Sequence, residues 1–214
     1  MEKKDLIKIL ESCNYIKSSK VKKAMLKVPR ELFVPKEYYG DAYLDTPLPI
    51  AGDQTISASH IHAVTLSELK LEEGEKVLEV GSGSGILLAY IREIVGEKGK
   101  VVGIEINKDT YEFAKGNLKK AGYKDIILIH GDGSLGYPKC APYHKIVVSA
   151  ASPDIPPPII EQLKPNGILL ITVGSPFGDQ NLIKVKKSKT GKLVKKELLP
   201  VIFVQLTGKF GYKL

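Results

Sequence analysis

Residues 77–85 read Val-Leu-Glu-Val-Gly-Ser-Gly-Ser-Gly, an apolar strand that runs directly into a glycine-rich turn and then a helical pattern. Glycine at positions 81, 83 and 85 allows a sharp turn and leaves no Cβ between the backbone and a ligand. In an open α/β sheet, such a turn lies at the carboxyl end of the first strand, where ligands bind. The stretch therefore predicts a ligand-binding turn, with a turn that is glycine-rich for packing alone as the alternative.

Short β-rich runs alternate with helical patterns from residue 76 onward. We expect strands at residues 76–80, 101–106, 126–130, 145–149 and 168–173. We expect helices at residues 86–95, 108–121 and 157–163, the last ended by the turn Pro165-Asn166-Gly167. This alternation is typical of a parallel sheet that is covered on both faces. The sequence therefore predicts an α/β fold with a doubly wound, mostly parallel sheet.

The segment before this core has a different pattern. Residues 3–28 read as two short helices, with Ser18 or Ser19 as the N-cap of the second helix and Pro29 at its end. Residues 30–59 are rich in proline, tyrosine and glycine, which indicates irregular structure packed on the rest of the molecule. A helical pattern returns at residues 60–71. We therefore expect a helical N-terminal extension.

The segment after the core is strand-like at residues 181–187, 193–199 and 201–206, with the turn signal Thr190-Gly191 between the first two runs. This pattern predicts an antiparallel addition to the sheet edge. A length of 214 residues favours one domain. We expect it to comprise a helical, substrate-covering segment (1–73), a cofactor-binding core (74–174) and C-terminal strands (175–214).

The composition restricts the classes of function. No apolar run approaches the roughly 18 to 20 residues that span a bilayer, and the N-terminus has no apolar signal region, so we expect a soluble, unsecreted, cytoplasmic protein. Cys13 and Cys140 lack metal-site spacing, so no metal is expected. The net charge of +8 could attract a polyanion, but only Arg30 and Arg92 are arginines. Such a lysine-rich surface favours the solvated charges of a thermophilic protein over nucleic-acid binding.

Four further features indicate the ligand of the glycine-rich turn. The dinucleotide fingerprint requires a third glycine where this chain has Ile86. Glu79 precedes the turn, where it would repel a pyrophosphate but favour the ammonium group of a methionine moiety. Glu105 ends the next strand 20 positions after Gly85, the distance at which a carboxylate binds ribose hydroxyls. Asp132 ends the third strand, where it could accept a hydrogen bond from an adenine amino group.

Together these features resemble the nucleotide-binding core of the class I S-adenosylmethionine methyltransferases, over residues 74–174. The resemblance implies that Glu105 binds the ribose and that Asp132 and Gly133 bind the adenine. For Glu105 an ordinary strand-end carboxylate remains the alternative, and for Asp132 a turn-capping residue. The resemblance also implies that the methionine end of the cofactor contacts the acidic strand residue and the turn: Glu79, Gly81, Ser82, Gly83, Ser84 and Gly85.

The segments outside the core resemble the protein-L-isoaspartate O-methyltransferases. The similar stretches are Val28-Pro-Arg-Glu-Leu-Phe-Val-Pro35, Ala42-Tyr-Leu-Asp-Thr-Pro-Leu-Pro-Ile50, Gln54-Thr-Ile-Ser57, Gly131-Asp-Gly133, Ala141-Pro-Tyr143, Ala150-Ala151, Gln162-Leu-Lys-Pro165 and Val204-Gln-Leu-Thr207. The resemblance covers nearly the whole chain. It implies S-adenosylmethionine as methyl donor, and damaged proteins and peptides with L-isoaspartyl residues as substrates. It gives no reason to expect a nucleic-acid or membrane partner, and we expect a monomer.

The family resemblance also implies the site residues. It makes Ser57 the active-site serine, with Gln54, Thr55, Ile56 and His62 close to the cofactor. Backbone groups of Ile56 to Ala58 would hold an extended peptide, and Thr207 would line the cofactor or peptide groove. An N-cap remains the alternative for Ser57, and a buried, satisfied side chain for His62. This chain departs from the family in having Asp53 where glycine is frequent and Ser59 where proline is frequent.

The chemistry of an isoaspartyl residue agrees with this interpretation. Its free α-carboxylate has a pKa of about 3.3 to 3.7 and is ionised near neutral pH, so methylation requires no general base. No Ser/His/Asp set, carboxylate pair or metal cluster is evident in the sequence. The alternatives are an RNA methyltransferase, which lacks a visible arginine-rich and aromatic module here, and a non-catalytic protein that keeps the cofactor fold.

Overall fold

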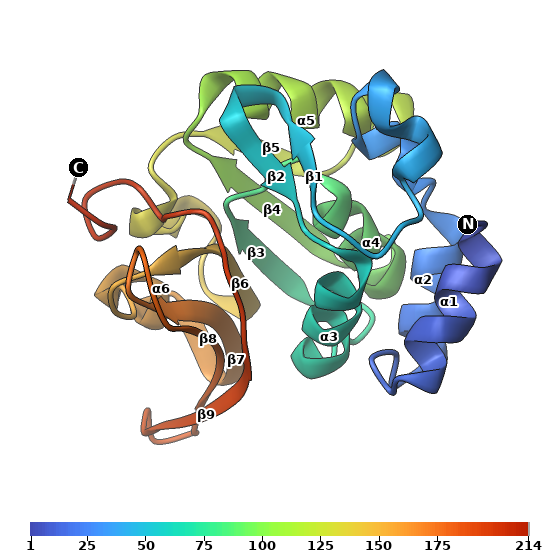
Figure 1. Cartoon of the computed structure of the whole chain (residues 1–214). Helices are drawn as coiled ribbons and strands as arrows, with labels where there is room; N and C mark the ends of the chain where they lie inside the picture. Colours follow the sequence, from blue (N-terminus) through green and yellow to red (C-terminus); the bar gives the residue numbers. More distant parts are fainter. Residues whose placement is uncertain (214) are drawn as a thin grey trace.

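The computed structural model describes residues 1–213, and a seven-stranded sheet forms its centre (Figure 1). The strand order across the sheet is β5-β4-β3-β6-β7-β8-β9. The first five of these strands are parallel, whereas β8 and β9 are antiparallel to their neighbours. The strands are β3 (Lys76–Val80), β4 (Lys100–Glu105), β5 (Ile127–His130), β6 (Tyr143–Ser152), β7 (Leu163–Gly174), β8 (Gln180–Lys187) and β9 (Leu193–Pro200).

Strand β3 lies in the interior of the sheet, third in the strand order, and is buried on both faces because its sequence is a nearly continuous apolar run. It pairs in parallel with β4 on one side and β6 on the other. The chain runs outward from β3 to β4 and β5, then returns to β6 on the opposite side. This reversal creates a topological switch point at the carboxyl end of β3, where ligands bind in open α/β sheets.

Helices cover both faces of the sheet, but unequally. One apolar cluster joins the N-terminal helices α1 (Lys3–Ser12) and α2 (Ser19–Lys27) with α3 (Ser59–Leu69), α4 (Ile86–Val95) and α5 (Lys108–Lys120). The other cluster includes the short α6 (Pro157–Glu161) and its neighbouring turns. Figure 1 shows the N-terminal helices and strands β8 and β9 at opposite ends of the molecule. The doubly wound α/β fold with a helical extension and antiparallel edge is confirmed.

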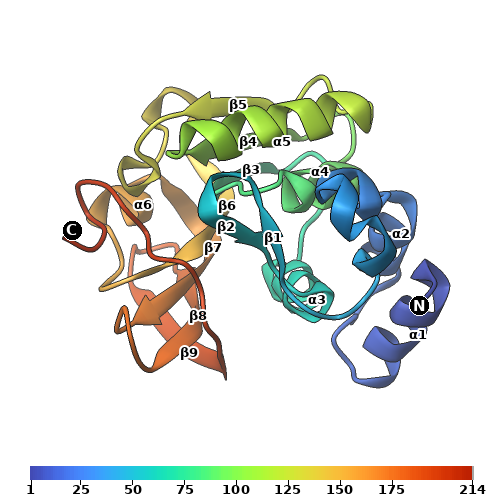
Figure 2. The same cartoon turned by 45° about the horizontal axis from the view of Figure 1, so that its top comes forward.

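The segment from 30 to 58 contains more structure than its proline and tyrosine content indicates. It forms the 3-10 helices η1 (Arg30–Phe33), η2 (Lys36–Asp41) and η3 (Ala51–Asp53) and the short strands β1 (Leu48–Ile50) and β2 (Gln54–Ile56). The two strands pair antiparallel as a hairpin. Figure 2 shows this hairpin between α3 and α5. Ser18, rather than Ser19, caps α2 by accepting a hydrogen bond of 3.3 Å from the Val21 amide.

Two expectations at the C-terminal side were wrong: the end of the last helix and the strand at residues 201–206. Helix α6 ends at Glu161, and β7 begins at Leu163, so the expected turn at residues 165–167 lies within an irregular start of β7. Residues 201–206 form no strand; only Gln205 makes an isolated bridge, to Ala151. This segment crosses the carboxyl ends of the strands instead of extending the sheet edge, and the Leu206 amide donates to the Ala151 carbonyl at 2.6 Å.

In residues 1–213 no helix has the length and apolar character to cross a membrane.

Candidate active site

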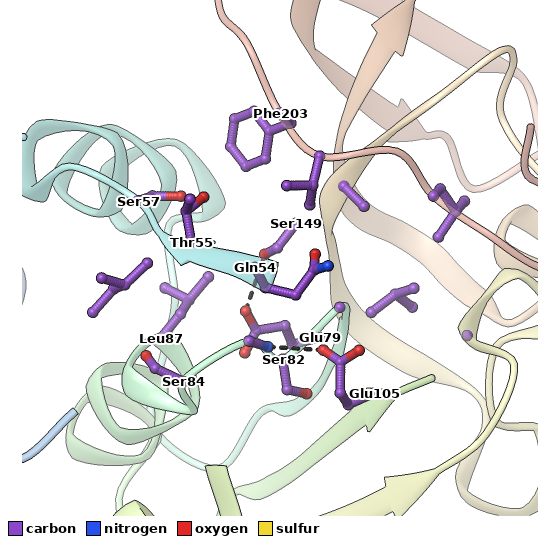
Figure 3. A pocket seen from close by; sticks show the side chains of 18 of the residues that line it. Gln54, Thr55, Ser57, Glu79, Ser82, Ser84, Leu87, Glu105, Ser149 and Phe203 are labelled. Atoms are coloured by element: carbon purple, nitrogen blue, oxygen red, sulfur yellow. Dashed lines mark hydrogen bonds between the residues drawn. The ribbon is translucent and has the colours of Figure 1, made fainter. Parts of the chain in front are cut away.

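A cavity of about 370 Å³ lies at the carboxyl ends of β3 and β4, at the switch point of the sheet (Figure 3). Parts of the chain that are distant in sequence form its wall: the β1–β2 hairpin, α3, the glycine-rich turn, and the C-terminal segment after β9. The residues of the wall that sequence analysis had named are Gln54, Thr55, Ile56, Ser57, His62, Glu79, Gly81, Ser82, Gly83, Ser84, Glu105, Gly133 and Thr207.

The glycine-rich turn adopts the left-handed conformation that its glycines permit. The φ angles are 78° at Gly81, 53° at Gly83 and 86° at Gly85. Gly81 and Gly83 line the cavity, whereas Gly85 does not. A Cβ on Gly85 would lie 3.1 Å from Cγ of Leu118, so this glycine allows α4 to pack closely on α5. The packing explanation therefore holds for one of the three glycines.

Glu79 is a buried carboxyl group in the wall of the cavity, with 2% of its surface exposed. Its Oε1 accepts a hydrogen bond of 3.0 Å from the Ser149 hydroxyl, as Figure 3 shows. Its Oε2 is buried and has no hydrogen-bond partner within residues 1–213. Burial raises the pKa of Glu79 well above its ordinary value, and the nearby charge of Glu105 raises it further. The cavity therefore contains an unsatisfied acceptor, suited to a cationic ligand group.

Glu105 connects the end of β4 to the glycine-rich turn. Its Oε2 accepts from the Gly83 amide at 3.0 Å, and its Oε1 accepts from the Asn107 amide at 3.0 Å. Each carboxylate oxygen keeps a further lone pair, so the side chain can still accept hydrogen bonds from a ligand. The geometry fits the ribose contact that the sequence predicts, and it adds a structural role in holding the turn.

The β1–β2 hairpin is attached to the start of α5. The Thr110 hydroxyl donates to the Ala51 carbonyl at 2.9 Å, and the Asn107 side-chain amide donates to the Gly52 carbonyl at 3.2 Å. Gly52 is necessary here because a Cβ would lie 2.5 Å from the Asn107 and Thr110 oxygens. The attachment holds β2, and with it Gln54, above the cavity (Figure 3).

Ser57 follows β2 and borders two spaces. One is the cavity, and the other is a groove of about 740 Å³ that Ala58 also lines. The carbonyl of Ser57 accepts a hydrogen bond of 2.8 Å from Nη2 of Arg30. The position of Ser57 at this junction allows its hydroxyl to face a ligand of the cavity and a ligand of the groove.

His62 is buried in α3 and lines the cavity. Its Nδ1 lies 3.4 Å from Nη1 of Arg30. Burial lowers the pKa of His62 well below its ordinary value, and the charge of Arg30 lowers it further. His62 is therefore a neutral ring at physiological pH, held by Arg30, which sequence analysis did not identify as a site residue.

Asp132 does not line the cavity. Its Oδ1 accepts from the Ser134 amide at 2.9 Å and hydroxyl at 2.7 Å, and its Oδ2 accepts from the Lys209 amide at 2.8 Å. The structure therefore gives it the turn-capping role that was the alternative, and the adenine contact stays a prediction. Its neighbour Gly133 does reach the cavity.

Several lining residues were missed by the sequence analysis. Ile106 and Asn107 follow Glu105 directly, and this position immediately after a strand end is a sequence signal that could have been used for both. Ser149 and Phe203 gave no local signal of this role, because their contribution depends on β6 and the C-terminal segment meeting at this edge of the sheet. Residues 204–206 stood in a stretch that resembles the family, but only Thr207 was assigned to the site.

The fold and the cavity define a class of protein. A seven-stranded sheet with an antiparallel edge, an acidic strand residue before a glycine-rich turn, and a carboxylate at the end of the next strand characterise the class I S-adenosylmethionine-dependent methyltransferases. In residues 1–213 no group of His, Cys, Asp or Glu side chains could hold a metal ion.

Comparison with known proteins gives the particular family. The model of the protein-L-isoaspartate(D-aspartate) O-methyltransferase family matches residues 1–211, and the chain belongs to this family. The protein-L-isoaspartate O-methyltransferase 2 of Archaeoglobus fulgidus is 52% identical over 196 residues, which cover 92% of this chain and 89% of that protein. The protein-L-isoaspartate O-methyltransferase of Pyrococcus abyssi is 46% identical over 210 residues, covering 98% and 96%.

A solved structure agrees with this assignment. The protein-L-isoaspartate O-methyltransferase of Plasmodium falciparum, crystallised with S-adenosyl-L-homocysteine, superposes on this chain with a TM-score of 0.87. The sequence identity is 27%, and the match covers 97% of this chain and 99% of the other. The fold is therefore shared over essentially the full length of both proteins.

Proposed function

We propose that this chain transfers a methyl group from S-adenosylmethionine to the α-carboxylate of L-isoaspartyl residues in damaged proteins and peptides, and so initiates their repair. The observation that carries the proposal is the junction at Ser57, which lines both the cavity and the neighbouring groove. A cofactor in the cavity and an extended peptide in the groove would meet at this serine. The relatives' names favour this function over RNA methylation.

The residues of the cavity fit S-adenosylmethionine. Glu79 supplies a buried, unsatisfied acceptor for an ammonium group, and the turn at Gly81 and Gly83 leaves room for a ligand against the backbone. Glu105 offers lone pairs to ribose hydroxyls. When bound, the cofactor supplies an electrophilic methyl group on a sulfonium centre.

The acceptor arrives as an anion, because the isoaspartyl α-carboxylate is ionised near neutral pH. The protein therefore has no proton to remove. His62 agrees with this requirement, because it is buried, neutral and held by Arg30. The contribution of the chain is to exclude water and to align the carboxylate, with the Ser57 hydroxyl as hydrogen-bond donor.

The groove supports recognition of a peptide main chain. Backbone groups of Ile56 to Ala58 would hold the substrate extended, which would admit many damaged proteins. Thr207 borders the cavity from the C-terminal segment. We further propose that the enzyme is a cytoplasmic monomer without a nucleic-acid partner. Light scattering would test the monomeric state, methyl transfer to RNA would test for a nucleic-acid substrate, and cell fractionation would test the location.

The test is the Ser57→Ala substitution. We expect cofactor affinity to be kept and turnover on an isoaspartyl peptide to fall about 10-fold to 100-fold, because one orienting hydrogen bond is worth about 1.5 to 3 kcal/mol. Turnover is measured as labelled methyl transfer to an isoaspartyl peptide, to its aspartyl counterpart and to bulk RNA.

The matched control is Ser188→Ala, directly after β8 and outside both the cavity and the groove, where the hydroxyl makes an exposed hydrogen bond with that of Thr190. Unchanged turnover in Ser57→Ala would remove the serine from the mechanism. Transfer to RNA or to the aspartyl peptide at the isoaspartyl rate would overturn the proposed function.

A further inference from the structure

Arg30 is a guanidinium group inside the protein, with only 1% of its surface exposed. Arginine is rarely buried to this extent unless it is paired with an acid. Arg30 forms no ion pair with any carboxylate of residues 1–213, whereas Arg92, the other arginine, pairs with Asp125. Burial of an unpaired charge is costly, and the hydrogen bonds of Arg30 must offset this cost.

These hydrogen bonds join three separate segments. Nε donates to the Ala42 carbonyl at 2.7 Å, directly after η2. Nη2 donates to the Ser57 carbonyl at 2.8 Å, between β2 and α3. Nη1 lies 3.4 Å from Nδ1 of His62. Two of the three partners thus line the cavity, and the third begins the segment 42–47 that leads to the β1–β2 hairpin.

The contact with His62 fixes the position of a proton. A guanidinium has donors only, so Nδ1 of His62 must accept the hydrogen bond. A neutral imidazole has one N–H, so the proton of His62 lies on Nε2. The groups around this ring are Arg30 from η1, Tyr90 from α4, whose ring centre lies 5.9 Å away, and His60 on the same helix. None of them is a carboxylate that would favour a charged imidazole.

We propose that Arg30 is a positioning residue for methyl transfer: it holds the backbone of Ser57 and keeps His62 in the form that carries its proton on Nε2. The role in turnover rests on the proposed function, but the state of His62 does not. Arg30 itself does not line the cavity, so it acts through the two residues that do. Its positive charge also lies directly behind the segment that would receive an anionic group.

The first experiment determines the tautomer of His62 without any turnover. Long-range proton–nitrogen NMR of the wild-type protein should show His62 with its proton on Nε2, and its signals should show no titration near the ordinary imidazole pKa of about 6.5. His62→Gln assigns the signals among the four histidines. A proton on Nδ1, or a titration near the ordinary value, would overturn the proposal.

The second experiment compares Arg30→Met and Arg30→Lys with Arg92→Met as the matched control. In Arg30→Met we expect kcat/KM for an isoaspartyl peptide to fall about 10-fold or more, and His62 to show a mixture of tautomers. Arg30→Lys keeps the charge but cannot reach three acceptors, so it should restore part of the activity. Arg92→Met lies outside the site and should keep the His62 tautomer and the peptide KM.

A double variant separates positioning from general destabilisation. If Arg30 acts through Ser57, the losses in Arg30→Met and Ser57→Ala should not multiply when both changes are combined. Multiplicative losses, or equal losses in Arg30→Met and Arg92→Met, would refute the positioning role. If Arg30→Met does not fold, Arg30→Lys and the wild-type tautomer still decide the question. An inactive wild type with the expected tautomer would instead count against the proposed function alone.

Discussion

At the scale of single residues, Glu79 combines two properties that oppose each other in the free protein. The sheet buries its carboxyl group, and within residues 1–213 only Ser149 donates to it. Burial without a cation disfavours the charged form, so the pKa of Glu79 is raised. A ligand ammonium would reverse this balance by favouring the carboxylate. Glu79 thus lowers the stability of the free protein near neutral pH, and the same burial provides a carboxyl group that can bind a cationic group of a ligand.

The Glu79→Gln variant tests this balance through pH. The folded protein keeps the Glu79 proton above the ordinary pKa of 4.5, where the unfolded chain loses it. The contribution of Glu79 to the free energy of unfolding is therefore fully present below pH 4.5. It is lost as the pH rises through the higher pKa that Glu79 has in the folded state. We therefore expect Glu79→Gln to be more stable than wild type at about pH 8 but not at about pH 4.

Denaturant unfolding at both pH values measures this difference. Calorimetry with S-adenosylmethionine in two buffers should detect proton release by the wild type and none by Glu79→Gln, which should also bind more weakly. Equal pH dependence of stability in the two proteins would show that Glu79 is ionised in the fold.

Ser59 shows how a departure from the family is accommodated. It is the first residue of α3, and its hydroxyl is buried without a partner in the described chain. The first helical position is suited to proline, because its N–H has no acceptor within the helix. The preceding Ala58 has φ of −54° and ψ of 151°, a conformation that proline tolerates after it.

We therefore expect Ser59→Pro to stabilise the protein by about 1 to 2 kcal/mol, by removing an unsatisfied hydroxyl and restricting the unfolded chain. Thermal unfolding measures this effect, and Ser59→Ala separates the loss of the hydroxyl from the effect of the ring. A lower unfolding temperature in Ser59→Pro would mean that the backbone at the start of α3 requires the serine.

At the scale of secondary-structure elements, the β1–β2 hairpin depends on its neighbours. Each strand has three residues, too few to be stable as an isolated hairpin. Hydrogen bonds from neighbouring elements hold it in place: Thr110 and Asn107 donate to carbonyls at its turn, and Arg30 donates to the carbonyl of Ser57 directly after β2. Asp53, between the strands, has φ of 56°, which explains why the family frequently has glycine there.

The Thr110→Val variant keeps the volume of the side chain but removes the donor to Ala51. We expect a loss of about 1 to 3 kcal/mol in local stability, because a carbonyl loses its partner. Amide hydrogen exchange should be faster at residues 48–56 than in wild type, and KM for the peptide should rise. Thr190→Val in the β8–β9 turn is the control. Unchanged exchange at residues 48–56 would show that the hairpin does not need this anchor.

At the scale of the whole molecule, the cavity joins all three segments of the chain. Residues 54–57 of the N-terminal segment, residues 79–84 and 104–107 of the core, and residues 203–207 of the C-terminal segment all line it. A ligand in the cavity would therefore contact the N-terminal segment, the core and the C-terminal segment at once. We infer that ligand binding stabilises the whole chain rather than the core alone.

S-adenosylhomocysteine at about 100 times its Kd should add about 2.7 kcal/mol to the free energy of unfolding. For a protein of this size this corresponds to a rise of roughly 5 to 11 °C in Tm. Calorimetry should show one transition that moves as a unit. Two transitions, of which only one responds to the ligand, would contradict the expectation of a single domain.

The sequence by itself determined β3, the glycine-rich turn and α4, and the position of Glu105. A buried strand, positive φ at glycine and an apolar helix face are all encoded within a few residues, so a local pattern is sufficient. The same reasoning failed at residues 201–206, because alternation of apolar residues does not distinguish a sheet strand from a segment that crosses strand ends.

Only the tertiary structure decided which side chains meet. Arg30 reaches Ser57 and His62 across 27 and 32 positions, Ser149 reaches Glu79 across 70, and Lys209 reaches Asp132 across 77. No periodicity spans such separations, because the strand order of the sheet and the path of the chain over its carboxyl edge set these contacts. The ligand-binding turn was therefore evident from local sequence, whereas the arrangement of charged and polar groups around it required the fold.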